Sequence, residues 1–368
     1  MHRRFVSPRA YVQGAGALDD APAEFDRLDA ERAYVLGGAT ALATVGDAVS
    51  AGLADAGIEV AHTAAGVDRC TDPTLDDHVE TAESTSADLV VGVGGGVAMD
   101  VATAVADRVD ATLAVVPTIA STDAPTSTIA VVYDDAGNFR EVRYRDRNPE
   151  LVLVDTAVVA GAPAQFLAYG MGDALATRFE AEAVAATGGA TDADGESSFA
   201  ARALAEEAYR RVREYGSDAL AAVRRDAVTP AVERVVEANT LLSGLGFESG
   251  GTAGAHAVQI GLTNAGVREP HGLLVGFGTV AELLARDADP ATVSEVLDVL
   301  FSVGLDVTLD DLGVGKGDLT AVGEGDLTAV GEVACEHGME LEPVDASPRR
   351  VADAVRTAHE LVRERRSE

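Results

Sequence analysis

The sequence predicts two domains, an α/β domain with a parallel sheet followed by an all-α domain. Over residues 1–162, strand-like runs alternate with helical patterns, and this alternation is typical of a parallel sheet with helices on both faces. Over residues 163–368, apolar residues recur at three- and four-residue steps and strand signals are scarce, as expected for packed helices. With 368 residues, 47% of them hydrophobic, the chain is long enough for two such cores.

The strands and helices of the first domain are expected in alternating order. We expect strands at residues 32–36, 58–62, 88–93, 112–116 and 151–155 and helices at residues 40–56, 74–86 and 97–108. Residues 88–93 contain almost no polar side chain, which is typical of a strand covered on both faces. Residues 128–134 and 141–145 flank the turn sequence Asp135-Ala136-Gly137-Asn138, and this pattern predicts a β-hairpin.

The second domain is expected to be helical throughout. The clearest helical patterns cover residues 165–183, 200–215, 230–242, 292–303 and 351–362. One short repeat interrupts them, because residues 317–324 and 325–332 both read GDLTAVGE. A single extra copy is too short to indicate a solenoid. We interpret it as a tandem duplication in a surface loop and assign it no function.

The net charge is strongly negative. The chain has 28 Lys and Arg residues against 61 Asp and Glu residues, which gives a formal charge of −33, and its sole lysine is Lys316. Such a chain repels nucleic acids and anionic membranes, so we expect neither as a partner. The acidic, lysine-depleted composition resembles that of proteins from halophilic archaea. Because the acids run along the whole chain, we interpret the charge as adaptation of the surface to salt rather than as a binding face.

The sequence also predicts a cytoplasmic location. The N-terminus leads into no apolar signal core. The longest uncharged apolar run, residues 89–99, is too short to span a bilayer. Two cysteines, Cys70 and Cys335, exclude a disulfide scaffold.

Two loops of the first domain have the composition of a nucleotide site. The strand at 88–93 continues into Gly94-Gly95-Gly96 and then into a helix, where backbone N–H groups and the helix dipole favour a phosphate. The fingerprint GxGxxG is not met, because Val97 takes its sixth position, and a tight turn without a ligand explains the loop equally well. Residues 117–127 follow the next strand and are rich in hydroxyls, which suit a ribose, a phosphate or an amide. An ordinary Ser/Thr loop is the alternative, but we expect the two loops to lie side by side.

Three residues of the second domain form a candidate metal site. His256 and His271 lie among small and apolar neighbours, and Asp173 is an acid within an apolar helical pattern. A buried carboxylate must be paired, metal-bound or protonated. Two imidazoles and a carboxylate suit Zn²⁺ and also Fe²⁺. The alternative is that all three are ordinary polar residues at helix contacts.

Several longer motifs carry a family resemblance. They are PTIASTDAPTS at residues 117–127, GMGDALATRFE at 170–180, EANTLLSGLGFESGG at 237–251 with Ala255-His256-Ala257 after it, YVQG at 11–14 and NPELVLVDT at 148–156. Taken in chain order, they resemble the glycerol-oxidising branch of the iron-containing alcohol dehydrogenase family. The resemblance implies a Rossmann-like nucleotide-binding domain over residues 1–162 and a helical metal- and substrate-binding domain over residues 163–368, the dehydroquinate synthase-like fold.

The resemblance also implies an activity and a set of site residues. The activity is NAD-dependent oxidation of glycerol to dihydroxyacetone in a homo-oligomer, commonly an octamer. Asp173, His256 and His271 would bind Zn²⁺, with Fe²⁺ as the alternative, and Asp123 would contact the polyol beside Asp173 and His256; all four would be catalytic. The residues that would line NAD are Gly95, Gly96, Asp100, Thr118, Ser121, Ser127, Ile129 and Tyr133.

Departures from the family pattern keep alternatives open. Val97 replaces a usual lysine, Leu273 a usual glutamate and Gln259 a second histidine. Gly37-Gly38 stands where an Asp normally bonds the adenosine ribose, so NADP use stays open. The competing hypotheses are a glycerol-1-phosphate dehydrogenase or other polyol dehydrogenase, and a degraded family member that binds nucleotide or metal without catalysis.

Overall fold

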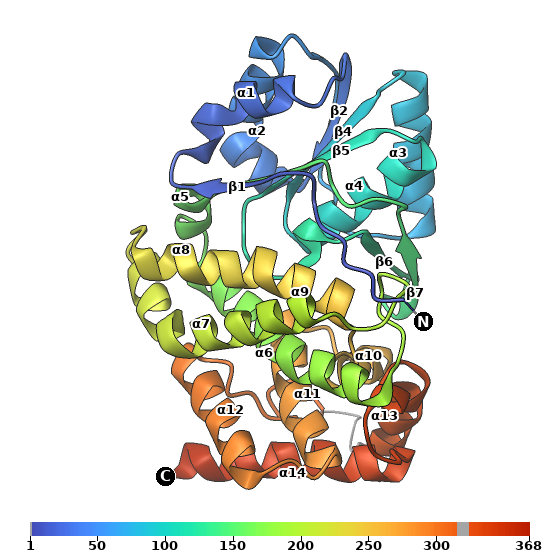
Figure 1. The fold of residues 1–368 in the computed structure, drawn as a ribbon, viewed down its shortest axis with the longest axis vertical. Helices are drawn as coiled ribbons and strands as arrows, with labels where there is room; N and C mark the ends of the chain where they lie inside the picture. The colour runs from blue at the N-terminus through green and yellow to red at the C-terminus, as the bar shows by residue number, and fades with distance from the viewer. Residues whose placement is uncertain (1, 315–323) are drawn as a thin grey trace. The chain divides into compact units, whose positions relative to one another are not determined.

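A computed structural model describes residues 2–314 and 324–368 of the chain (Figure 1). Contacts divide it into two compact units. The sheet unit comprises Ser7–Leu167 and Ala221–Gly244, and the helical unit comprises Met1–Val6, Ala168–Leu220 and Leu245–Glu368. The single boundary expected at residue 162 therefore differs from the observed division, in which the chain crosses between units several times. Helical periodicity predicts the helix over residues 230–242, but it does not show which core that helix joins.

The sheet unit contains the expected parallel sheet. Its six strands run in the order β1-β8-β5-β4-β2-β3, and all neighbours are parallel. The strands are β1 (Tyr11–Gly14), β2 (Arg32–Gly37), β3 (Glu59–Ala65), β4 (Leu89–Gly94), β5 (Thr112–Pro117) and β8 (Leu151–Asp155). Every residue of β4 is buried, which confirms its interpretation as a covered central strand. Strand β1 was not predicted, since its four half-buried residues at the sheet edge carry little hydrophobic pattern.

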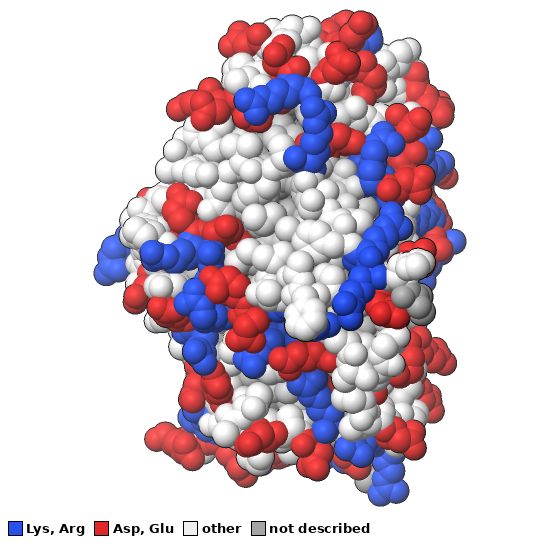
Figure 2. Space-filling model, in the orientation of Figure 1, with Lys and Arg blue, Asp and Glu red and all other residues white. Residues whose placement is uncertain are grey.

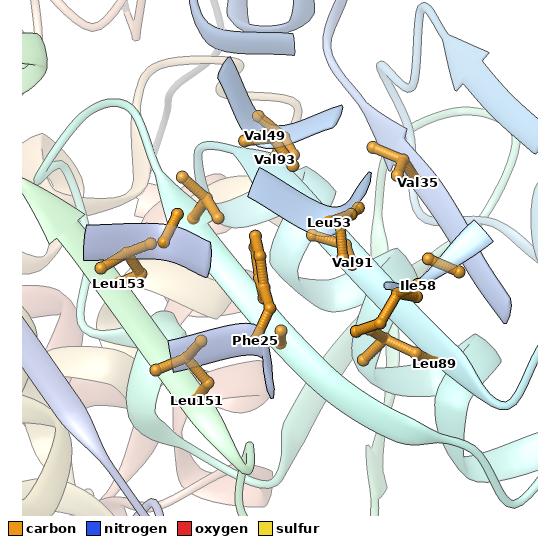
Figure 3. Packing of buried hydrophobic residues seen from close by; sticks show 14 of the residues in the cluster. Phe25, Val35, Val49, Leu53, Ile58, Leu89, Val91, Val93, Leu151 and Leu153 are labelled. Atoms are coloured by element: carbon orange, nitrogen blue, oxygen red, sulfur yellow. The ribbon is translucent and has the colours of Figure 1, made fainter. Parts of the chain in front are cut away.

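Helices cover both faces of the sheet. They are η1 (Ala17–Asp20), α1 (Ala21–Asp26), α2 (Ala39–Asp55), α3 (Asp72–Ser84), α4 (Gly96–Arg108) and α5 (Thr156–Ala160). On one face, Phe25 of α1 and Leu53 of α2 belong to the same buried cluster as Val91 of β4 (Figure 3). On the other face, Gly92 meets α4 so closely that a Cβ would lie 2.6 Å from the Cβ of Ala102. Successive residues of β4, Val91 and Gly92, thus face opposite sides of the sheet, and helices cover both sides.

Three further elements complete the sheet unit. The expected hairpin is confirmed as β6 (Ile129–Tyr133) and β7 (Phe139–Tyr144), an antiparallel pair. A short η2 (Ala124–Thr126) precedes it. The helix expected at 230–242 is α8 (Pro230–Glu237) followed by η3 (Ala238–Leu242), a π-helical turn. The turn is tied to the loop after β5, because Asn239 Nδ2 donates to the carbonyl oxygen of Ala120 at 3.0 Å.

The helical unit is formed by the expected second set of helices. They are α6 (Ala164–Thr187), α7 (Phe199–Val223), α9 (Ser243–Gly250), α10 (Gly254–Asn264), α11 (His271–Ala285), α12 (Pro290–Val303), α13 (Glu324–Glu336), η4 (Met339–Leu341) and α14 (Pro348–Ser367). Helix α10 packs against α11 and α13, and α11 packs against α14. Helix α11 is buried along almost its whole length, so it forms the centre of this unit.

The second copy of the octapeptide repeat does not lie in a surface loop. Most of the first copy, residues 317–323, and Lys316 lie outside the described residues. The second copy belongs to α13, where Leu327 and Val330 are buried. The backbone of α13 also approaches α10, since a Cβ on Gly261 would lie 2.5 Å from the carbonyl oxygen of Val330. The apolar spacing of 327, 330 and 334 was a helical signal that the loop interpretation overlooked.

The surface carries the expected acidic residues. Figure 2 shows Asp and Glu spread around the visible face, interspersed with arginines, and not gathered into one patch. None of the described helices combines the length and the apolar character needed to cross a bilayer.

Candidate active site

The three predicted metal ligands come together in the helical unit. Asp173 lies in α6, His256 in the first turn of α10, and His271 begins α11. Asp173 Oδ1 lies 3.2 Å from Nε2 of His271 and 3.4 Å from Nε2 of His256. One ligand atom from each residue lies within 4.8 Å of the others, and no other group of His, Cys, Asp and Glu in the described part of the chain meets this criterion. Their convergence is as expected, although their role as ligands stays a prediction.

Glycines set the spacing between the three helices. A Cβ on Gly172 would overlap the carbonyl oxygen of Gly272, and a Cβ on Gly272 would overlap that of Tyr169. Helices α6 and α11 therefore touch through their backbones directly beside Asp173 and His271. At the next crossing, a Cβ on Gly278 of α11 would overlap the carbonyl oxygen of Ala255 in α10. These backbone contacts hold the three helices close enough together for the side chains of Asp173, His256 and His271 to meet.

The electrostatics of the group favour a charged cluster. Burial alone would raise the pKa of Asp173, but the imidazoles of His271 and His256 lower it well below its usual range. Burial alone would lower the pKa of His256, whereas Glu180 and Asp173 raise it well above its usual value. His256 is 16% exposed and His271 is 32% exposed, while Asp173 is fully buried. A metal would replace a proton on His256, so metal binding is expected to weaken at low pH.

The donor set fits a divalent metal. Two imidazole nitrogens and one carboxylate oxygen are the ligands of catalytic zinc sites, which keep one further position for water or substrate. The same set also suits Fe²⁺. Both histidines are partly exposed, so the group is not sealed within the core.

Glu180 was not predicted and completes the cluster. It lies on α6 seven residues after Asp173, is fully buried, and its Oε2 lies 2.7 Å from Nδ1 of His256. The sequence signal was available, because an i, i+7 pair of acids in an apolar helix places both on one face. Like Asp173, Glu180 is an acid within an apolar helical pattern.

A second buried acidic pair lies close to the N-terminus of α10. Glu282 of α11 and Glu342 are both fully buried side chains, and Arg286 Nη1 lies 3.2 Å from Glu282 Oε1. The N–H of Gly254 donates to Glu342 Oε1 at 3.1 Å. Burial, together with the neighbouring carboxylates, raises the pKa of Glu282 well above its usual value and that of Glu342 to about 7.

This pair should make stability depend on pH. The folded pair keeps protons that the unfolded chain releases above its ordinary pKa of 4.5. The free energy of unfolding should therefore fall as pH rises from about 4.5 to about 7. In Glu282→Gln, one acid becomes neutral, so we expect a higher melting temperature than wild type above about pH 7 and a flatter pH dependence. Calorimetry between about pH 5 and about pH 8 measures both.

Glu83→Gln is the matched control for this prediction. Glu83 is exposed on α3, so its replacement should leave the pH dependence as in wild type. A Glu282→Gln protein that melts below wild type above about pH 7, with an unchanged pH dependence, would contradict the assignment.

The two loops of the expected nucleotide site lie side by side in the sheet unit. The N–H of Thr118 donates to the carbonyl oxygen of Gly94 at 2.9 Å. A Cβ on Gly95 would lie 2.6 Å from Ile119 Cδ1, and a Cβ on Gly96 would lie 3.2 Å from Thr122 Oγ1. This adjacency confirms the expectation drawn from neighbouring strands. Gly95 is the N-cap of α4 and offers no side-chain cap, so the first turn of the helix presents backbone N–H groups, as an anion site requires.

The other expected nucleotide residues surround these loops. Asp100 is buried in α4 and accepts a backbone hydrogen bond from Val131, while burial raises its pKa to about 8. Ser127 Oγ donates to the carbonyl oxygen of Ala124 at 3.2 Å. Ile129 and Tyr133 are the two ends of β6, and Ser121 is half-buried in the loop after β5. All belong to the sheet unit, and their contact with a cofactor stays a prediction.

Asp123 also belongs to the sheet unit, whereas the three expected metal ligands belong to the helical unit. It is buried, and Ser243 Oγ donates to its Oδ2 at 2.7 Å. Ser243 directly follows the π-helical turn η3, and such turns are frequent at functional sites. A Cβ on Gly244 would overlap Thr126 Oγ1, so the chain after η3 packs tightly against the loop that carries Asp123.

The family departures can also be placed. Val97 is exposed in the first turn of α4, and Leu273 is buried in α11. Gln259 is buried, and its Nε2 donates to Thr263 Oγ1 at 2.8 Å within α10. All three departures lie within regular helices.

Comparisons with known proteins show the family. Residues 8–156 match the model of iron-containing alcohol dehydrogenases. A glycolaldehyde reductase of Halobacterium salinarum is 40% identical over 98% of both chains, and a glycerol dehydrogenase of Escherichia coli is 40% identical over 97% of both. The chain belongs to the iron-containing alcohol dehydrogenase family. As a member, it is an alcohol or polyol dehydrogenase, and the family implies a metal and NAD(H).

Solved structures of family members share the fold. A probable glycerol dehydrogenase from Sinorhizobium meliloti superposes with a TM-score of 0.91 at 34% identity, covering 98% of this chain and 99% of that one. The glycerol dehydrogenase of Schizosaccharomyces pombe has the same TM-score at 30% identity, covering 98% and 91%. The expected combination of a Rossmann-like domain with a helical domain is thereby confirmed for this iron-containing alcohol dehydrogenase.

Proposed function

We propose that the chain catalyses NAD-dependent oxidation of glycerol to dihydroxyacetone with a divalent metal at Asp173, His256 and His271. The observation that carries the proposal is the convergence of three ligand atoms within 4.8 Å of one another. Relatives named glycerol dehydrogenase, 40% identical over 97% of both chains in Escherichia coli, support the choice of substrate. We propose zinc as the metal, with Fe²⁺ as the alternative, and a homo-oligomer as the active form.

The residues of the helical unit bind the metal and leave room for substrate. When bound, a divalent metal supplies Lewis acidity that lowers the pKa of a substrate hydroxyl, and NAD accepts the hydride. The two imidazoles would be neutral ligands and Asp173 would contribute one negative charge, so a divalent metal and its three ligands together would keep a net positive charge. That charge favours a deprotonated hydroxyl over a neutral one. The reaction releases one proton, and the partial exposure of both imidazoles gives it a path to water.

Asp123 is proposed to orient the polyol. A carboxylate accepts hydrogen bonds from hydroxyl groups, and the 2.7 Å bond from Ser243 fixes the direction of this one. A polyol held by such a group presents the same carbon for reaction in each turnover, and orientation of this kind supplies a large part of catalysis.

The glycine loop is proposed to bind the pyrophosphate of NAD. Gly95 and Gly96 place no side chain at the first turn of α4, where the helix dipole favours an anion. The neighbouring hydroxyls of Thr118 and Ser121 suit the ribose and amide groups. Because Val97 supplies no cation here, backbone N–H groups carry most of the electrostatic attraction.

A second candidate activity is the reduction of glycolaldehyde. It is favoured by the relative from Halobacterium salinarum, a glycolaldehyde reductase 40% identical over 98% of both chains. The chemistry is the same hydride transfer in the opposite direction, between a two-carbon hydroxyaldehyde and its diol. The same ligands and the same cofactor site would serve it.

A substrate panel tests these proposals. Protein purified at high salt is assayed for glycerol-dependent formation of NADH, for glycolaldehyde-dependent oxidation of NADH and NADPH, and for activity on glycerol 1-phosphate, each with and without a chelator. We expect glycerol oxidation that the chelator abolishes and that added metal restores. Elemental analysis identifies the metal, and light scattering gives the oligomeric state. Full activity of metal-free protein would reject the metal proposal, and glycolaldehyde as the sole substrate would select the second candidate.

Gly38 offers a test of the proposed cofactor orientation. Gly38 is the N-cap of α2 with φ −63° and ψ 144°, and a Cβ there has its nearest contact 3.9 Å away. Aspartate therefore fits at 38 but not at 37, where a Cβ would overlap the carbonyl oxygen of Val93. We expect Gly38→Asp to raise the preference for NAD over NADP by at least about tenfold, because its carboxylate bonds the ribose hydroxyl and repels a 2′-phosphate.

The ratio of kcat/KM for the two cofactors measures this effect. Ala51→Asp adds the same charge at an exposed position of α2 and should leave the ratio unchanged. An equal shift in both variants would mean that overall charge, and not a contact at the ribose, is responsible.

A further inference from the structure

We propose that Glu180 is a positioning residue that holds His256 in the one tautomer able to bind the metal. The inference rests on the proposed metal site and assigns a role to a residue outside the expected ligand set. The observation behind it is that the imidazole of His256 lies between two fully buried carboxylates. Its Nδ1 lies 2.7 Å from Glu180 Oε2, and its Nε2 lies 3.4 Å from Asp173 Oδ1.

The Glu180 carboxylate is itself fixed by the start of α10. Its Oε1 accepts hydrogen bonds from the N–H of Ala253 at 2.9 Å and from the N–H of His256 at 3.0 Å. The N–H of Gly254, which follows Ala253, donates to Glu342 Oε1 at 3.1 Å. Three of the four N–H groups of residues 253–256, at the N-terminus of α10, thus bind two buried carboxylates. The plane of Glu180 cannot turn without losing two of these bonds.

A fixed carboxylate determines which nitrogen of His256 holds the proton. An ionised carboxylate only accepts hydrogen bonds, so the nitrogen facing it must be the donor. In the neutral ring that nitrogen is Nδ1, which leaves the lone pair on Nε2, the atom that faces Asp173. Partners of this kind fix both the tautomer and the ring orientation of metal-binding histidines.

The variant Glu180→Gln separates this role from simple capping of α10. The two N–H donors at the Oε1 position require an oxygen there, so the amide NH₂ of glutamine must take the Oε2 position. It then donates to Nδ1 of His256 and places the ring proton on Nε2, where it blocks a metal. Shape and both bonds to α10 are kept, so a purely structural role predicts little change.

Metal affinity of the metal-free protein, titrated with Zn²⁺ and Co²⁺ against a chromophoric chelator, is the test. We expect Glu180→Gln to lose about 10–100-fold in affinity, the usual effect of removing such a partner, while its melting temperature without metal stays close to wild type. Glu282→Gln is the matched control, because it makes the same change at another buried glutamate of the helical unit that bonds no ring nitrogen of His256. Its metal affinity should equal that of wild type.

The outcomes separate this inference from the proposed function. Wild-type protein that binds no metal overturns both. Equal affinity in wild type and Glu180→Gln overturns the positioning role alone. If Glu180→Gln does not fold, a crystal structure of the zinc-loaded wild type decides. Ligation by Nε2 with Glu180 on Nδ1 supports the inference, and ligation by Nδ1 overturns it.

Discussion

Replacing His256 by alanine is expected to remove the bound metal and to abolish polyol oxidation. The substitution takes away one of three ligands and leaves Asp173 and Glu180 as buried carboxylates that have lost the imidazole between them. Loss of a direct ligand should exceed the roughly 10–100-fold loss in affinity that removal of an outer partner causes. Elemental analysis and the NADH assay, on the same preparation at high salt, measure the two effects.

His2→Ala is the control for this prediction. It makes the same change on an exposed side chain near the N-terminus, so metal content and activity should stay at the wild-type level. A His256→Ala protein that keeps a full complement of metal would reject His256 as a ligand. One that loses metal and still oxidises glycerol would reject the role of the metal in the reaction.

The parallel sheet was predictable because its signals are local. Strand β4 is apolar at every position and is bounded by a glycine loop, and its length and flanks are those of a covered strand. Strand β1 was missed because its pattern is weak, and it becomes a strand only by pairing with β8 across the chain. A four-residue segment shows no sequence pattern that would predict such long-range pairing.

The site residues were predictable where a polar or charged residue stands within a stretch of apolar or small residues. Asp173 in an apolar helix and two histidines among small residues are each unfavourable unless they are partnered, and this selected the group that the structure brings together. Glu180 has the same property, so its burial was equally predictable, whereas the sequence does not show which ring nitrogen of His256 it faces. The helix crossings at Gly172 and Gly272 were equally hidden, since a helical glycine shows neither its neighbour nor the distance.

Those crossings carry the second prediction, that Gly172→Ala loses both stability and metal affinity. The new methyl group would overlap the carbonyl oxygen of Gly272 and lie 2.9 Å from Leu305 Cδ1. A backbone oxygen cannot move aside as a flexible side chain does, so α6 and α11 must separate. Overpacking of this kind costs about 1–3 kcal/mol, and the separation also moves Asp173 away from His271. Calorimetry of the metal-free protein and the chelator titration measure the two losses.

A glycine without such a neighbour shows why the position matters. A Cβ on Gly46 of α2 has only an ordinary contact, 3.6 Å from Leu42, and Gly46→Ala should stabilise its helix by about 0.5–1 kcal/mol. The same chemical change thus has opposite signs at the two glycines. If Gly172→Ala were as stable as wild type and bound metal equally well, the backbone contact of α6 and α11 would not set the ligand spacing. The convergence of the triad would then have to come from the side chains themselves.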